Sequence, residues 1–262
     1  MTMNSNTSSL TALRVRASRA KQWVQTGLLP RLGTTKSVRY LGWDVAAESM
    51  DETVAKHLDH PTKAIMLDWL AADPLLPERF SLLDIGCGPG VLAAMIARHP
   101  QLKTRVRYTG LDQSAPALEY CRASYGSGFE FLNLDLQTQS LPGHYDAVVI
   151  SEVVEHLPHY KPFITAALAL RPRVFALTTF GAIPGLRRDR LRWNAGHQAY
   201  MNSYSFAQLH EFLRAQTGQL YVADLGTQEF TRYWFPRKTL AVFYLRLAEA
   251  RVTWTPDGWK KE

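Results

Sequence analysis

A glycine-rich turn between an apolar run and a helical run constrains the fold of this chain more than any other feature. Residues 82–85 are followed by Gly86, Gly88 and Gly90 in the spacing GxGxG, and residues 91–98 then contain neither glycine nor proline. A strand that turns this tightly into a helix needs backbone angles that glycine adopts readily. The missing side chains also let a ligand approach the helix N-terminus. The turn therefore predicts a ligand-binding strand–turn–helix unit.

From Phe80 onward, short β-rich runs alternate with helical stretches, which predicts an α/β fold with helices on both faces of a mostly parallel sheet. Two later runs, 219–225 and 239–245, would form an antiparallel pair at one edge. Ser205 is expected to cap a helix that ends at Arg214. The other expected strands lie at about 80–85, 106–111, 129–133, 145–150 and 173–179, and the helices near 90–98, 115–124 and 159–170.

Acidic residues stand at the ends of the first three predicted strands. Asp84 ends the first, Asp112 the second, and Asp135 follows the third. Open α/β sheets bind ligands at the carboxyl ends of their strands, where the strand order reverses. Each aspartate alone could be a helix cap or a turn residue. Together they predict a polar ligand-binding site at this edge of the sheet.

The order of these motifs resembles the class I S-adenosylmethionine (SAM)-dependent methyltransferases over roughly residues 80 to 245. The matching stretches are LLDIGCGPG, YTGLD, NLDL and YDAVVISEVVEHL. The resemblance implies a Rossmann-like, seven-stranded sheet, with Asp84 orienting the SAM ammonium and Asp135 contacting the adenine amino group. A dinucleotide oxidoreductase, the alternative, would share only the first two motifs. The expected cofactor-binding residues are Asp84, Gly86, Cys87, Gly88, Gly90, Asp112, Gln113, Asp135, Leu136 and Ser151.

The residues after the fourth predicted strand are candidates for catalysis. Glu152, Glu155 and His156 have the spacing i, i+3 and i+4, which predicts one face of a helical turn. An ExxEH run with a later His resembles quinone-biosynthesis O-methyltransferases and small-RNA 2′-O-methyltransferases; in the latter, these four residues hold a divalent metal. We expect catalytic roles for His156, Glu152 and His197, with His156 acting without a metal. The alternative is Mg²⁺ or Mn²⁺ bound by Glu152, Glu155, His156 and His197.

The expected activity is in-line O-methylation of a small aromatic or anionic molecule. The stretch 184–193 has four arginines where a substrate lid would lie, which favours an anionic acceptor. Residues 170–173 lack the glycine pair usual in small-molecule members, so no subfamily is assigned. The alternatives are a metal-dependent 2′-O-methyltransferase of RNA ends and a non-catalytic SAM-binding scaffold protein.

The excess positive charge is confined to the start of the chain. Residues 1–43 contain seven basic residues and no acidic one, whereas the rest contains 23 of each. A balanced body argues against a nucleic-acid partner. The two cysteines, Cys87 and Cys121, are too few for a disulfide framework, and no apolar run is long enough to span a membrane. We therefore expect a cytoplasmic protein.

The N-terminal region is predicted to be a helical extension. Apolar residues recur at helical spacing over 10–28, and Pro61 marks a helix start within 44–76. We expect residues 1–76 to form a basic extension or lid and residues 77–262 to form the SAM-binding domain. A targeting segment or a partner-binding helix within 1–43 remains an alternative.

Overall fold

The computed structural model describes residues 49–135, 139, 143–195, 199–216, 218–227, 239–247, 252–255 and 258–261. Four predictions lie outside these residues: the helix over 10–28, the lid, targeting or partner-binding role of residues 1–43, the cofactor contact of Leu136 and the catalytic role of His197.

One mixed sheet forms the centre of the molecule, and it confirms the predicted fold class. The strand order is β3 (Glu130–Asn133), β2 (Val106–Asp112), β1 (Phe80–Ile85), β4 (Ala147–Ser151), β5 (Val174–Ile183), β10 (Thr239–Arg246) and β9 (Gln219–Thr227). The first five strands in chain order are parallel, whereas β10 runs antiparallel to both β5 and β9. The short strand β8 (Tyr204–Ser205) pairs in parallel with the last two residues of β5.

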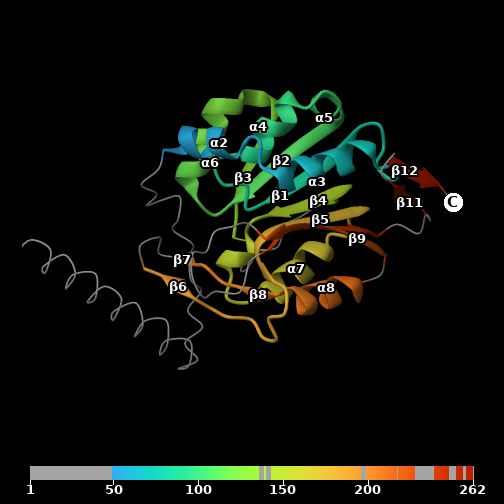
Figure 1. Cartoon of the computed structure of the whole chain (residues 1–262). Helices are drawn as coiled ribbons and strands as arrows, with labels where there is room; N and C mark the ends of the chain where they lie inside the picture. The colour runs from blue at the N-terminus through green and yellow to red at the C-terminus, as the bar shows by residue number, and fades with distance from the viewer. Residues whose placement is uncertain are drawn as a thin grey trace, which may run out of the picture.

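Helices cover both faces of this sheet (Figure 1). Neighbouring residues of β1 face opposite sides, so Leu82 packs in one core cluster and Leu83 in the other. On the Leu82 side lie α2 (Met50–His57), α3 (Pro61–Ala72), α4 (Val91–Arg98), α5 (Leu102–Arg105) and α6 (Ala115–Tyr125), followed by the short turn η2 (Gly126–Gly128). On the Leu83 side lie α7 (Tyr160–Leu168) and α8 (Phe206–Arg214), and Ser205 caps α8 as predicted by accepting from Gln208 N.

The corner between α2 and α3 is fixed at both ends. Ser49 and Glu52 form a capping box at the start of α2, and Pro61 occupies the first turn of α3, as predicted. Just after α3, buried Asp73 accepts hydrogen bonds from Arg246 Nη2 at 2.8 Å and Tyr244 Oη at 2.9 Å. Helix α3 therefore shares one core with the sheet.

The structure contains three features that the sequence did not predict. Strand β5 continues to Ile183, and β6 (Trp193–Asn194) pairs with β7 (Ala199–Tyr200), within a stretch expected to be a loop. Near the C-terminus, β11 (Val252–Thr255) pairs with β12 (Gly258–Lys261). Across the part of the chain that the structure describes, no helix has the length and apolar character of a membrane span.

Candidate active site

The glycine turn after β1 is held by backbone hydrogen bonds to β2. Gly86 N and Cys87 N both donate to Leu111 O, at 2.7 and 3.0 Å, and Gly88 N donates to Asp112 Oδ2 at 2.9 Å. Gly86 has a φ of 77°, and a Cβ there would lie 2.4 Å from Val153 Cγ2. A side chain at this position would therefore be strained and would also displace the segment after β4.

A cavity of about 270 Å³ lies beside this turn, at the carboxyl ends of β1, β2 and β4. Most of the residues predicted to bind the cofactor line it: Asp84, Gly86, Cys87, Gly88, Asp112, Gln113, Asp135 and Ser151. The same cavity continues to the residues after β4, because Glu152 and His156 also line it. The residues predicted to bind the cofactor and those predicted to take part in catalysis therefore line one cavity.

Gly90 has close neighbours other than the cavity. It is the N-cap of α4 with a φ of 81°, and it is not among the residues that line the cavity. A Cβ there would lie 2.6 Å from the Tyr125 ring and 3.0 Å from Cys121 Sγ. Close packing of α4 against α6 therefore accounts for glycine at this position, and its contact with the cofactor stays a prediction.

The two acids on β1 and β2 have different surroundings. Burial raises the pKa of Asp84 to about 7, although a hydrogen bond from Tyr108 Oη at 2.7 Å opposes this effect. Asp112 instead accepts backbone hydrogen bonds from Gly88 N at 2.9 Å and Ser114 N at 2.8 Å. Asp112 thus ties the glycine turn to the start of α6 while lining the cavity.

Cys87 and Cys121 are neighbouring buried thiols. Their Sγ atoms lie 3.7 and 3.4 Å from Gly88 O. A hydrogen bond between the two thiols, together with burial, raises the pKa of Cys87 well above its usual range. This supports a packing role for Cys87 in the turn, since only a thiolate is a strong nucleophile.

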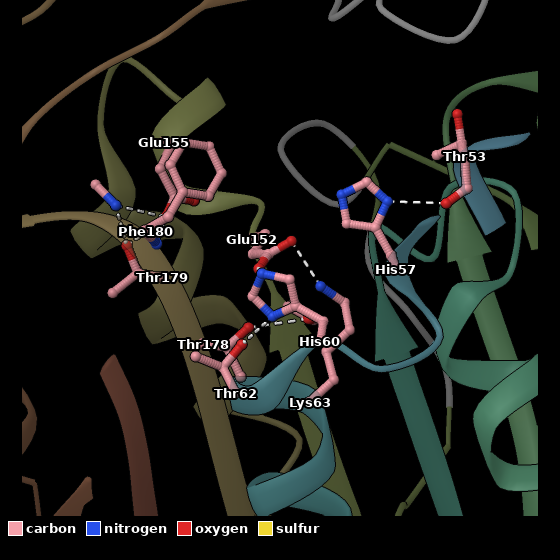
Figure 2. Close-up of polar contacts among 12 residues, drawn as sticks. Thr53, His57, His60, Thr62, Lys63, Glu152, Glu155, Thr178, Thr179 and Phe180 are labelled. Carbon is pink, nitrogen blue, oxygen red and sulfur yellow. Dashed lines mark hydrogen bonds and ion pairs between the residues drawn. The ribbon is translucent and has the colours of Figure 1, made fainter. Parts of the chain in front are cut away.

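Glu152, Glu155 and His156 do not form one face of a helical turn, so that prediction was wrong. Glu152 has a left-handed φ of 58°, and only Val154–His156 form a short 3₁₀ turn, η3. Figure 2 shows the two glutamates pointing to different places, Glu155 toward Thr179 and Phe180, and Glu152 toward Lys63. The helical spacing in the sequence is broken by this backbone reversal at Glu152.

Glu155 anchors η3 to β5. Its fully buried carboxylate accepts hydrogen bonds from Thr179 Oγ1, from Phe180 N at 2.7 Å and from Gly181 N at 3.1 Å. Glu155 does not line the cavity, and the described residues contain no group of three His, Cys, Asp or Glu side chains arranged for a metal. Three members of the alternative metal set, Glu152, Glu155 and His156, therefore do not form one cluster, and the fourth, His197, lies outside the described residues.

Glu152 is held by Lys63 of α3 and by His60, the N-cap residue of α3. Lys63 Nζ lies 2.6 Å from Glu152 Oε2, and His60 Nε2 lies 3.2 Å from Oε1. Burial alone would raise the pKa of Glu152, but the charges of Lys63 and His60 outweigh it, and the pKa is lowered. Burial lowers the pKa of His60. Glu152 is thus a carboxylate at neutral pH.

His156 has a fixed ring orientation. Its Nδ1 lies 2.8 Å from Tyr200 O, which can only accept, so Nδ1 carries a proton. In the neutral ring, Nε2 is then the unprotonated nitrogen. The ring lines the cavity beside Phe180, with the ring centroids 6.2 Å apart.

Three polar residues that line the cavity were not predicted as site residues: Thr53, His57 and Lys63. The sequence signal for Lys63 was a single lysine in a largely apolar stretch, residues 61–67, and the residue is 5% exposed. His57 is part of no sequence motif. The exposed arginines at 187, 188, 190 and 192 do not line the cavity, and their role in binding an anionic acceptor stays a prediction.

The chain matches known methyltransferases in sequence. A family model described as a methyltransferase domain matches residues 82–172. A ubiquinone biosynthesis O-methyltransferase from Methylobacterium sp. (strain 4-46) is 30% identical over 205 residues, 68% of this chain and 76% of the relative. A protein of the same name from Erwinia tasmaniensis is 31% identical over 121 residues, 42% of this chain and 46% of the relative.

Solved structures share the fold at low sequence identity. Magnesium protoporphyrin IX methyltransferase from Synechocystis PCC 6803 with bound SAM has a TM-score of 0.51 at 18% identity, covering 87% of this chain and 96% of that one. A plantazolicin methyltransferase in complex with S-adenosylhomocysteine (SAH) has a TM-score of 0.51 at 12% identity, covering 81% and 96%. The sequence relatives are methyltransferases, which argues against the oxidoreductase alternative. By its sequence relatives, its fold and its glycine turn, the chain belongs to the class I SAM-dependent methyltransferases.

Proposed function

We propose that this enzyme transfers the methyl group of SAM to a hydroxyl group of a small aromatic molecule, with His156 as the general base. One observation carries the proposal: the His156 ring lines the same cavity as the glycine turn, and its bond to Tyr200 O fixes which nitrogen is unprotonated. A base must reach the proton that it removes before its pKa matters.

The glycine-turn end of the cavity fits the charges of SAM. We assign the methionine carboxylate to Lys63, which is the buried cation lining the cavity, and the ammonium to Asp84 and Glu152. Asp112 would accept from the ribose hydroxyls, and Asp135 would accept from the adenine amino group. When bound, SAM supplies a methyl group on a positively charged sulfur.

The other end of the cavity fits an aromatic acceptor. Phe163, Phe180 and Leu157 line it with apolar surface, and His156 adds a polar group. Nε2 of His156 takes the proton of the acceptor hydroxyl, and Tyr200 O stabilises the imidazolium through the proton on Nδ1. The name of the relatives, ubiquinone biosynthesis O-methyltransferase, supports oxygen as the methylated atom. His197 remains a predicted acceptor-pocket residue.

The test is transfer of labelled methyl groups into a fractionated host extract. The purified chain is incubated with methyl-labelled SAM and with separate small-molecule, RNA and protein fractions. We expect label in aromatic small molecules, and expect the same transfer with and without a metal chelator. Label confined to RNA or protein would overturn the proposal.

A further inference from the structure

His57 belongs to the cavity wall although it precedes the methyltransferase motifs. It ends α2, and it lines the cavity together with Thr53 one turn earlier. In Figure 2 the side chains of His57, His60 and Lys63 lie on the side of Glu152 away from Glu155. The α2–α3 corner therefore brings a second imidazole, besides that of His156, to the same space.

The His57 ring is held as firmly as the His156 ring. Its Nδ1 lies 2.8 Å from Thr53 O, which can only accept, so Nδ1 carries a proton and Nε2 is the unprotonated nitrogen of the neutral ring. The ring also stacks on His60, with centroids 6.0 Å apart and an interplanar angle of 27°. Both histidines thus present the same kind of acceptor nitrogen.

Helix α3, which begins four residues after His57, is itself anchored. Lys63 joins α3 to Glu152 by a short ion pair of 2.6 Å, and Asp73 joins the end of α3 to buried Arg246. A side chain on such a fixed element can discriminate between ligands, because little entropy is lost when it binds.

We propose that His57 is a second acceptor-binding residue, whose Nε2 accepts a hydrogen bond from a polar hydrogen other than the one removed by His156. The inference rests on the proposed function and deepens it: the acceptor is an aromatic compound with two hydrogen-donating groups. A site built to bond a donor disfavours the analogue that lacks it, because the site's polar atom is left unpaired. His57 then determines specificity, while His156 remains the base.

The probes are the three isomeric dihydroxybenzenes and their monomethyl ethers, in which one donor is blocked. Steady-state kcat/KM is measured for each pair with labelled SAM. For the isomer of matching spacing, the wild-type enzyme should prefer the dihydroxy probe by about fivefold or more, the value of one neutral hydrogen bond.

Two variants separate the role of His57 Nε2 from that of the hydrogen bond between Nδ1 and Thr53 O. His57→Asn keeps a donor near the position of Nδ1 for Thr53 O but removes Nε2, and should abolish the preference, mainly through KM. His57→Gln keeps a polar atom near the position of Nε2 and should restore part of it. His159→Asn is the matched control, because His159 is exposed outside the cavity. SAH affinity and thermal unfolding verify that each variant is folded.

The outcomes are distinct. A preference that survives in His57→Asn, or no preference in the wild-type enzyme for any isomer, overturns the role of His57 and leaves the proposed function standing. If the chain binds SAM but methylates none of these probes, and labels no aromatic small molecule in the extract, both fail together.

Discussion

The two ends of the cavity are built in different ways. The SAM end comes from consecutive strand ends, and its shape is set by backbone bonds such as those from Gly86 and Gly88 to β2. The acceptor end is assembled from α2, η3, α7 and β5, which are far apart in the sequence. The SAM end can therefore be predicted from short sequence motifs, whereas the acceptor end depends on how distant elements pack.

The largest effect should come from the base at the acceptor end. Asn at position 156 can still donate to Tyr200 O but has no Nε2, so His156→Asn should lower kcat by about 10²- to 10⁴-fold. SAH affinity, measured by calorimetry, should stay within about twofold. A variant that keeps most of its activity would show that the acceptor hydroxyl needs no base here.

The next effect concerns the backbone of the SAM end. Gly86→Ala places a Cβ against Val153 at a φ of 77°, so it should weaken SAH binding by more than about tenfold and destabilise the fold by about 1–3 kcal/mol. Gly128→Ala is the matched control, because nothing lies within 4 Å of its added Cβ. Equal effects of the two substitutions would contradict the role given to the turn.

Lys63 belongs to the proposed SAM end, but it comes from α3 and not from a strand end. Lys63→Met should lower SAH affinity by about tenfold, because a charge-assisted bond to the carboxylate is lost. Affinity for 5′-methylthioadenosine, which lacks the amino-acid part, should change by less than about twofold. A parallel loss for both ligands would mean that Lys63 only holds Glu152 in place.

The smallest effect is on the pH dependence of stability. The pKa of Asp84 is raised from 3.8 to about 7, so the folded chain holds this proton more tightly than the unfolded chain. The resulting stabilisation is complete below about pH 4 and is lost as the pH rises through 7. Asp84→Asn should therefore show a smaller fall in unfolding free energy between pH 5 and 8 in urea titrations. If the fall in unfolding free energy were the same as in the wild-type chain, a group other than Asp84 would hold the proton.

Most of the fold could be predicted because its signals are local. The apolar runs, the glycine turn and Ser205 gave the main strands, the antiparallel pair and the capped α8 at nearly the observed positions. The short pairings β6–β7 and β11–β12 were missed, since two- to four-residue strands leave no periodic pattern.

The site residues that lie in local sequence motifs were predicted, and those that reach the site by packing of distant elements were not. Asp84 and Asp112 stand at strand ends, where topology alone brings them together. Glu155 was misplaced because a left-handed residue at Glu152 breaks the helical spacing, and sequence periodicity does not show a backbone reversal at a non-glycine residue. His57 and Lys63 reach the cavity only through the packing of α3 on the sheet.

Both ends form one cavity, across which we propose that a methyl group passes to a small aromatic hydroxyl. Calorimetry with a bisubstrate ligand, an SAH analogue carrying a phenol tethered at the sulfur position, tests this proposal. The ligand should bind at least about tenfold more tightly than SAH, because linked groups pay the entropic cost of association once. This gain should shrink in His156→Asn. Binding no tighter than that of SAH would contradict the claim.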